Sequence, residues 1–138
     1  MVDRVKLRQK IAFIEKNLRL LEELKSVPFE KFDQDSVNFN AAVRILQISI
    51  ESILDVANHI VARERLGMPN TYAESFDLLA SGKVITSEYA TRAKNMVRFR
   101  NRAVHLYMDI NEKEVYNILR NNLADFREFI RQVLARYF

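Results

Sequence analysis

The sequence contains no cysteine, two glycines, two prolines and no uninterrupted apolar run of about 18 residues. Without cysteine there can be no disulfide, no thiolate metal site and no thiol nucleophile. The scarcity of glycine and proline argues against a sheet protein rich in β-turns, and the composition favours an all-α fold. The charged first residues and the lack of a long apolar run predict neither a signal peptide nor a membrane partner, so we expect a cytoplasmic protein.

Apolar residues recur three or four positions apart in long stretches, as in amphipathic helices. We expect one helical domain over residues 1–138, folded as an antiparallel, up-and-down bundle of four to five helices. Proline and mixed polar residues over 28–34 predict a linker. The predicted helices are Asp3–Lys25; a long central helix that begins at Asp35 or Ser36 and stops at Gly67; a short helix from Thr71 to about Ser81; a helix that begins at Thr86 or Ser87; and a last helix opened by Asn111.

The segment from Tyr89 to Met108 contains no acidic residue but five basic ones. The rest of the chain carries 17 basic and 18 acidic residues, so the whole net charge of +4 comes from this segment. A local cationic band points to a polyanionic partner, most simply the phosphodiester backbone of a nucleic acid. The five basic residues are Arg92, Lys94, Arg98, Arg100 and Arg102.

Arg100 falls in the middle of the apolar stripe of this helix, where a cation needs an anion or a hydrogen-bonding partner. One interpretation is a structural ion pair with Glu51 or Asp55 of the long central helix, and the other is a role in binding phosphate. Phe99, on the side away from the stripe, is the phenylalanine that stays open as a stacking surface. The stripe consists of Tyr89, Ala93, Met96, Val97 and Val104.

His105 follows Arg100 by five residues, which places the two side chains about 140° apart on a regular helix. Its neighbours on the preceding turn are Asn101 and Arg102. If Arg100 and His105 act together, either the helix ends or distorts between them, or a second chain completes the site. A histidine near a helix end is also compatible with a plain surface or packing role.

His59, the other histidine, lies next to core positions of the central helix, and we interpret it as a structural residue. The sequence lacks HExxH, GxGxxG, a Walker loop and GxSxG. We therefore expect neither a metal site nor a cofactor.

The nonapeptide over residues 99–107, FRNRAVHLY, resembles the R-x4-H-x-Y signature of the HepT-like branch of the HEPN superfamily. Its members are small all-helical toxins encoded beside MNT-type minimal nucleotidyltransferase antitoxins. The likeness extends over nearly the full chain, through the long central helix, the following LGMPNTYAESFDLL, the turn at Gly82 and the final helix.

The resemblance implies a metal-independent endoribonuclease that acts on RNA, with an active cleft formed across a homodimer. It implies Arg100 and His105 as the catalytic residues and Asn101 as their polar companion. It also implies that the partner nucleotidyltransferase attaches AMP to the hydroxyl of Tyr107. The candidates for contacts with the RNA backbone are Lys94, Arg98 and Arg102.

The implied chemistry is physically sensible. RNA can be cleaved without a metal when its 2′-OH attacks the adjacent phosphorus, given a base for that proton, an acid for the leaving oxygen and a cation for the phosphorane. Histidine suits the first two tasks and arginine the third. Because one chain has one motif histidine, we expect the base and the acid to be His105 of the two subunits.

Two other functions stay open at this point. Some HEPN proteins have no nuclease activity and serve as binding partners of a nucleotidyltransferase, which would make this chain a non-catalytic interaction module. A bare polyanion binder would bind RNA with a steep salt dependence and yield no cleavage products.

Overall fold

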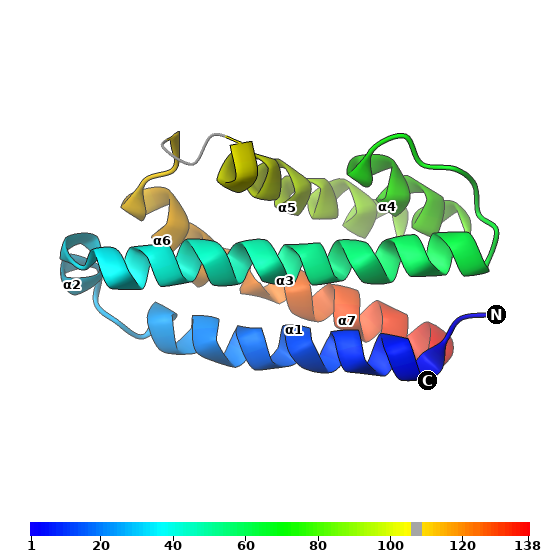
Figure 1. Cartoon of the computed structure of the whole chain (residues 1–138), viewed down its shortest axis with the longest axis horizontal. Coiled ribbons are helices and arrows are strands. Elements are labelled where there is room, and N and C mark those ends of the chain that lie inside the picture. Colours follow the sequence, from blue (N-terminus) through cyan, green and yellow to red (C-terminus); the bar gives the residue numbers. More distant parts are fainter. Residues whose placement is uncertain (106–108) are drawn as a thin grey trace.

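The structure, a computed structural model, describes residues 1–105 and 109–138, which contain seven helices and no strand. Figure 1 shows α1, α3, α5 and α7 running in alternating directions, with the two chain termini at the same end of the bundle. The all-α, up-and-down bundle is confirmed. The helices are α1 (Arg4–Lys25), α2 (Phe29–Gln34), α3 (Ser36–Arg63), α4 (Tyr72–Ser81), α5 (Ser87–His105), α6 (Glu112–Asn121) and α7 (Leu123–Tyr137).

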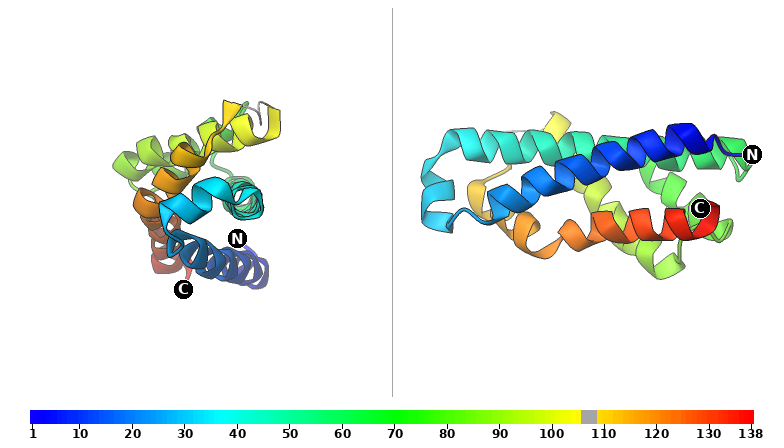
Figure 2. Two further views of the ribbon diagram at one scale, coloured as in Figure 1. Left: turned by 90° about the vertical axis from the view of Figure 1, so that its left-hand side faces the viewer. Right: turned by 90° about the horizontal axis from the view of Figure 1, so that it is seen from below.

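Helix α3 is the central element. It contacts α1, α2, α4, α5 and α6, and the end-on view in Figure 2 shows it between α1 on one side and α5 on the other. Among the described residues it is also the helix long and apolar enough to cross a membrane, but 56% of its most apolar stretch is buried inside the molecule. Its length and composition are those of a core helix on which the other helices assemble.

Three predicted helix starts are confirmed by their caps. In each case a side-chain oxygen accepts a backbone N–H of the first turn, which satisfies a donor that the helix leaves free. Helix α3 ends at Arg63, earlier than the predicted stop at Gly67, because Arg65 already has a φ of 54°. The capping bonds run from Val37 and Asn38 to Asp35, from Glu74 to Thr71 and from Glu114 to Asn111.

Helix α2 occupies the stretch predicted as a linker, so that prediction was wrong. The rings of Phe29 and Phe32 both lie 5.2 Å from the ring of Tyr116 on α6, and Phe32 is fully buried. The Tyr116 hydroxyl donates to the carbonyl of Val27, at 2.6 Å. Burial of this aromatic cluster stabilises a turn of helix that local propensity alone would not hold. Pro28 stands just before the helix, where its missing N–H costs nothing.

The predicted last helix is two helices, α6 and α7, separated at Asn122. This residue has φ −120° and ψ 0°, outside the helical range, and its amide Nδ2 donates to Asp125, at 3.4 Å. Asparagine side chains that bond to nearby groups compete with helix continuation. The break keeps both apolar faces on the core, since Leu119 and Leu123 on either side of it are buried.

His59 has the structural role that the sequence predicted. Its Nε2 accepts the backbone N–H of Asp3, at 3.0 Å, and so ties α3 to the start of α1. An acceptor nitrogen must be unprotonated, so this bond requires the neutral ring. Burial, and secondarily the cation of Arg63, lower the pKa of His59 below its usual value.

The lowered pKa of His59 predicts a loss of stability in mild acid. The unfolded chain takes up its proton as the pH falls through about 6.5, whereas the folded chain resists protonation until a lower pH. The free energy of unfolding should therefore decrease from pH 7.5 to pH 5 and level off below the folded pKa. Urea unfolding at several pH values measures this. His59→Gln keeps an acceptor without a titrating group, so the slope should flatten; an unchanged slope would contradict the assignment.

Candidate functional site

Helix α5, which carries the FRNRAVHLY motif, is anchored at its beginning. The hydroxyl of Thr86 accepts the backbone N–H of Tyr89, at 3.1 Å, and caps the helix start. The buried Tyr89 hydroxyl donates to the Asp125 carbonyl of α7, at 2.5 Å, and burial raises the pKa of this phenol. The helix is continuous from Ser87 to His105, so the motif residues up to His105 have regular helical positions.

Two residues of α5 lie differently from the prediction. Phe99, expected to be a possible stacking surface, is only 6% exposed and lines an internal gap with Leu46 and Ile50 of α3. Val104, expected on the core stripe, is 40% exposed. Helix α5 packs against two neighbours, α3 and α4, rather than against one, so its buried surface is wider than the predicted stripe. Phe99 is thus a core residue and cannot stack on a base.

Arg100 is held on three sides. Its Nε donates to a carboxylate oxygen of Glu51 on α3, at 3.2 Å, and its Nη1 donates to the side-chain oxygen of Asn101, at 3.3 Å. The guanidinium carbon lies 5.1 Å from the ring centre of Tyr72, the first residue of α4. The Arg100 side chain is 18% exposed, so it reaches the surface only in part. Three elements therefore fix the position of one cation.

The structural ion pair considered for Arg100 exists, and its partner is Glu51. Asp55, the other candidate, pairs with Lys10 of α1, at 3.0 Å. The pair with Glu51 leaves other donors of Arg100 available, because a guanidinium has several N–H donors and Glu51 accepts from Nε alone. Arg100 can be part of the structure and still offer donors to an anion.

The basic residues of the acid-free segment are largely neutralised in space. Lys94, a predicted RNA-backbone contact, pairs with Asp77 of α4, at 2.8 Å, and Arg92 pairs with Asp125, at 3.3 Å. Within the described chain Arg98 has no ion pair, and its Nη1 donates to Asn95. The excess charge seen along the sequence is therefore not a free cationic surface, and Arg98 is its most available member.

Arg102 joins the end of α5 to the start of α6. Its guanidinium bonds both carboxylate oxygens of Glu114 and also bonds Asp109, through Nε at 3.2 Å and through the Asp109 carbonyl at 3.0 Å. These bonds raise the pKa of Arg102, with Glu114 as the main cause. Arg102 thus connects the end of α5, before residues 106–108, with Asp109 and Glu114, which follow them. Tyr107, the predicted site of AMP attachment, lies outside the described residues.

His105 is exposed at the last position of α5. Because the helix neither ends nor breaks before it, the Arg100 and His105 side chains point about 140° apart. One chain does not direct the two predicted catalytic residues at the same point. Asn101 lies between them, since it bonds Arg100 and precedes His105 by one helical turn.

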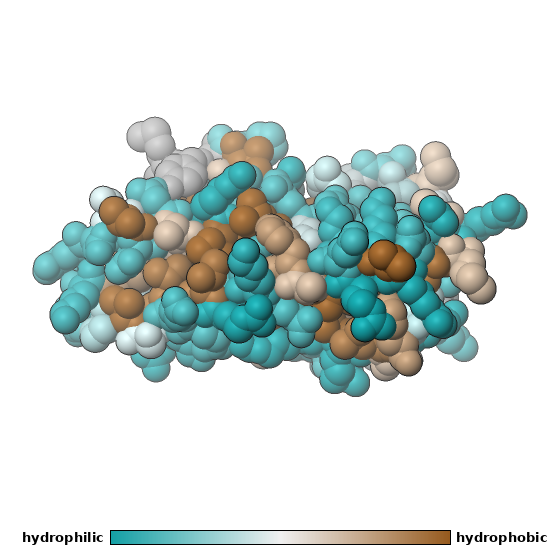
Figure 3. All heavy atoms as spheres, turned by 60° about the horizontal axis from the view of Figure 1, so that its bottom comes forward, coloured by the Kyte–Doolittle hydropathy of each residue, from teal (hydrophilic) through white to brown (hydrophobic). Residues whose placement is uncertain are grey.

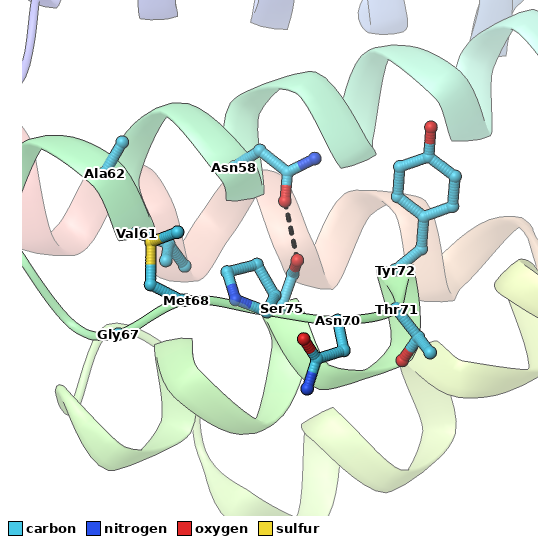
Figure 4. Close-up of a pocket in the computed structure, with 10 residues that line it drawn as sticks. Asn58, Val61, Ala62, Gly67, Met68, Asn70, Thr71, Tyr72 and Ser75 are labelled. Atoms are coloured by element: carbon cyan, nitrogen blue, oxygen red, sulfur yellow. Dashed lines mark hydrogen bonds between the residues drawn. The ribbon is translucent and has the colours of Figure 1, made fainter.

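A pocket of about 430 Å³ lies next to Arg100, between α3 and the 67–72 loop, and sequence reasoning did not find it. Figure 4 shows Tyr72 at one side of it and the Asn58–Ser75 hydrogen bond, 2.6 Å long, at its base. The only sequence signal here was the capping box that begins at Thr71. Among the described residues there is no group of three or more potential metal ligands.

Comparison with known proteins assigns the chain to a family. A model of the family described as ribonuclease HepT-like matches residues 14–133. The chain belongs to this family. The family and enzyme class that the FRNRAVHLY motif suggested are thereby confirmed: the chain is a HepT-like ribonuclease.

Relatives of known sequence and structure agree. The mRNA nuclease HepT of Shewanella oneidensis is 33% identical over 126 residues, which cover 91% of this chain and 94% of that one. The tRNA nuclease HepT of Aphanizomenon flos-aquae is 27% identical over 83% of this chain and 80% of its own length. The structure of a tri-AMPylated Shewanella oneidensis HEPN toxin in complex with MNT antitoxin is 32% identical, covers 98% of this chain and 99% of that chain, and has a TM-score of 0.88.

Proposed function

We propose that this HepT-like chain cleaves RNA without a metal, with Arg100 and His105 as catalytic residues and two copies of the chain forming each cleft. The observation that carries the proposal is the state of Arg100. Its guanidinium is fixed by Glu51, Asn101 and Tyr72 and keeps N–H donors without a partner in the described chain. A positioned, partly exposed guanidinium suits the binding of a phosphate in one orientation.

In the proposed reaction, His105 of one subunit takes the proton of the RNA 2′-OH while this oxygen attacks the adjacent phosphorus. His105 of the other subunit gives a proton to the departing 5′-oxygen, so the proton count balances. Arg100 stabilises the extra negative charge on the phosphorane oxygens, and Asn101 positions it. The products are a 2′,3′-cyclic phosphate and a 5′-OH end. Of the three RNA-backbone candidates, Arg98 is the strongest, because Lys94 and Arg102 would have to leave carboxylate partners.

The geometry supports a second copy, and the chain has a surface that it can occupy. Regular helix geometry separates Arg100 and His105 within one chain, so we expect another chain to supply the missing group. Next to Glu51, a groove between α1 and α3 is lined by Phe13, which is 41% exposed, and by Ile48. Figure 3 shows exposed apolar side chains among charged ones on this side of the molecule. A groove that shares Glu51 with the Arg100 site favours a homodimer that places two motifs together.

The direct test is incubation of the purified protein with total RNA in EDTA, beside the His105→Ala variant. We expect fragments with 2′,3′-cyclic phosphate ends from the wild-type protein alone. Binding without fragments, weakened steeply by salt, would instead indicate a polyanion binder. If the protein neither cleaves nor binds RNA, it is a non-catalytic interaction module.

Mixing subunits tests whether each cleft needs two histidines. When wild-type protein is unfolded and refolded together with an equal amount of His105→Ala protein, a quarter of the dimers should carry two intact histidines. The specific activity, per total subunit, should then fall with the square of the wild-type fraction, to about one quarter of the value of the wild-type protein at equal mixing. A linear fall, to one half, would show that each subunit works alone. Mixing with His59→Gln protein controls for the refolding step.

We also propose that the chain acts in the cytoplasm as one helical domain over residues 1–138, beside a cognate MNT-type nucleotidyltransferase that inactivates it by attaching AMP to Tyr107. Support comes from the Shewanella oneidensis HEPN toxin, which is tri-AMPylated and bound to an MNT antitoxin. The Bacillus subtilis protein YutE, 24% identical with a TM-score of 0.86, is described as cytosolic.

A further inference from the structure

We propose that the pocket between α3 and the 67–72 loop binds one unpaired nucleobase of the RNA substrate and so sets the sequence preference of cleavage. This inference rests on the proposed function, because it takes Arg100 as the phosphate-binding residue. The pocket, about 430 Å³ in volume, is within the usual size range for small-ligand sites. It combines an aromatic ring, an apolar wall and a buried polar group at its bottom. These are the features that bind an unstacked nucleobase.

Tyr72 connects the pocket to the proposed phosphate site. The guanidinium carbon of Arg100 lies 5.1 Å from the centre of the Tyr72 ring, and the same ring lines the pocket. Tyr72 is 42% exposed, so a base can reach it. A nucleotide whose phosphate contacts Arg100 therefore has its base next to a ring on which it can stack. Base stacking on aromatic side chains is a main source of affinity for single-stranded RNA.

Asn58 supplies a group that can read the edge of a base. Its side-chain oxygen accepts the hydroxyl of Ser75, which is fully buried, at 2.6 Å. This bond fixes the amide plane and leaves the Nδ2 donors without a partner in the described chain. In Figure 4 the Asn58 nitrogen points toward Tyr72, into the space where a stacked base would lie. An oriented amide donor distinguishes bases that present an acceptor from bases that present an amino group.

The remaining walls fit the flat faces of a base. Val61 of α3, which is buried, and Met68 and Pro69 of the loop supply apolar surface to the pocket. Asn70 of the loop is also among the lining residues, and Figure 4 shows its side-chain amide on the side of the loop away from Asn58. The pocket lining contains no Asp, Glu, Lys, Arg or His, so it favours an uncharged ring over a second phosphate.

Cleavage of matched RNAs tests the proposal. Four single-stranded oligonucleotides that differ only in the base next to a mapped cleavage site are cut by the wild type and by Asn58→Asp, which replaces the donors by an acceptor of equal size. We expect the ratio of kcat/KM between the preferred base and the others to change by about tenfold. Ratios cancel the general effect of an added negative charge. Asn117→Asp, which makes the same charge change at an exposed position of α6, should leave the ratios as they are. Unchanged ratios in Asn58→Asp would overturn the proposal.

A binding measurement separates this inference from the proposed catalysis. The ¹H–¹⁵N resonances of the Asn58 side chain are followed in the His105→Ala protein during titration with AMP, GMP, CMP and UMP. At least one nucleotide should shift them, and Tyr72→Ala should abolish the shift while Tyr72→Phe keeps it. A shift without any RNA cleavage by the wild type would refute the catalytic proposal alone. No shift with any nucleotide, or a shift with AMP together with unchanged cleavage ratios in Asn58→Asp, would refute the pocket as an RNA-base site.

Discussion

Replacement of His105 by alanine is expected to reduce RNA cleavage by at least about 100-fold, and Arg100→Ala by a factor of about 10²–10³. A positioned general acid or base contributes about 10²–10⁴ in rate, and each cleft loses both when His105 is removed from both subunits. Loss of a cation aimed at the developing phosphorane charge costs about 10²–10³. The initial rate on a fluorogenic single-stranded RNA, measured in EDTA, gives both factors.

The controls differ because the two residues have different surroundings. His105 is exposed, so its variant should keep the wild-type circular dichroism spectrum, unfolding midpoint and dimer mass. Arg100→Ala removes the cation that pairs with Glu51 and is expected to lower stability by about 1 kcal/mol or more, so Arg100→Lys is measured beside it. The lysine variant retains the charge but not the fork, and should recover binding more than rate. Retained cleavage in a folded His105→Ala dimer would refute the assignment.

The fold was largely predictable because local and global signals agree in this chain. The apolar periodicity of α1, α3 and α5, the capping residues and the scarcity of glycine all specify helices before any tertiary contact is known. The error at residues 28–34 occurred because tertiary burial there outweighs local propensity. Helix α2 forms because Phe29 and Phe32 pack on Tyr116, a residue more than 80 positions away that no local pattern connects with them.

The candidate site was only partly predictable, because charge partners come from other helices. The sequence identified Arg100 and offered Glu51 as a partner, and the structure contains that pair. It could not identify Tyr72, which reaches Arg100 because the 64–71 loop returns α4 to the side of α5. The cationic band along the sequence is neutralised in the same way, by acids such as Asp77 that approach in space.

Addition of AMP to Tyr107 is expected to abolish RNA cleavage. Tyr107 follows His105 by two residues, and a phosphodiester there adds one negative charge and a bulky adenosine close to the proposed RNA-binding cleft. Arg102, the nearest cation along the chain, already forms ion pairs with Glu114 and Asp109. We therefore expect the new phosphate to compete with the RNA phosphate for Arg98 or Arg100, and the adenosine to exclude RNA by its volume.

The measurement is intact mass together with RNase activity after incubation with the cognate nucleotidyltransferase, ATP and Mg²⁺. We expect the wild-type protein to gain the mass of one or more AMP groups on the peptide that contains Tyr107, and its activity to fall to the level of His105→Ala. Tyr107→Phe has no hydroxyl to modify, so its own activity should not change when the nucleotidyltransferase and ATP are added. If activity is suppressed without a gain in mass, and equally in Tyr107→Phe, the partner inhibits by binding, because physical blockage of the cleft needs neither ATP nor a phenolic hydroxyl.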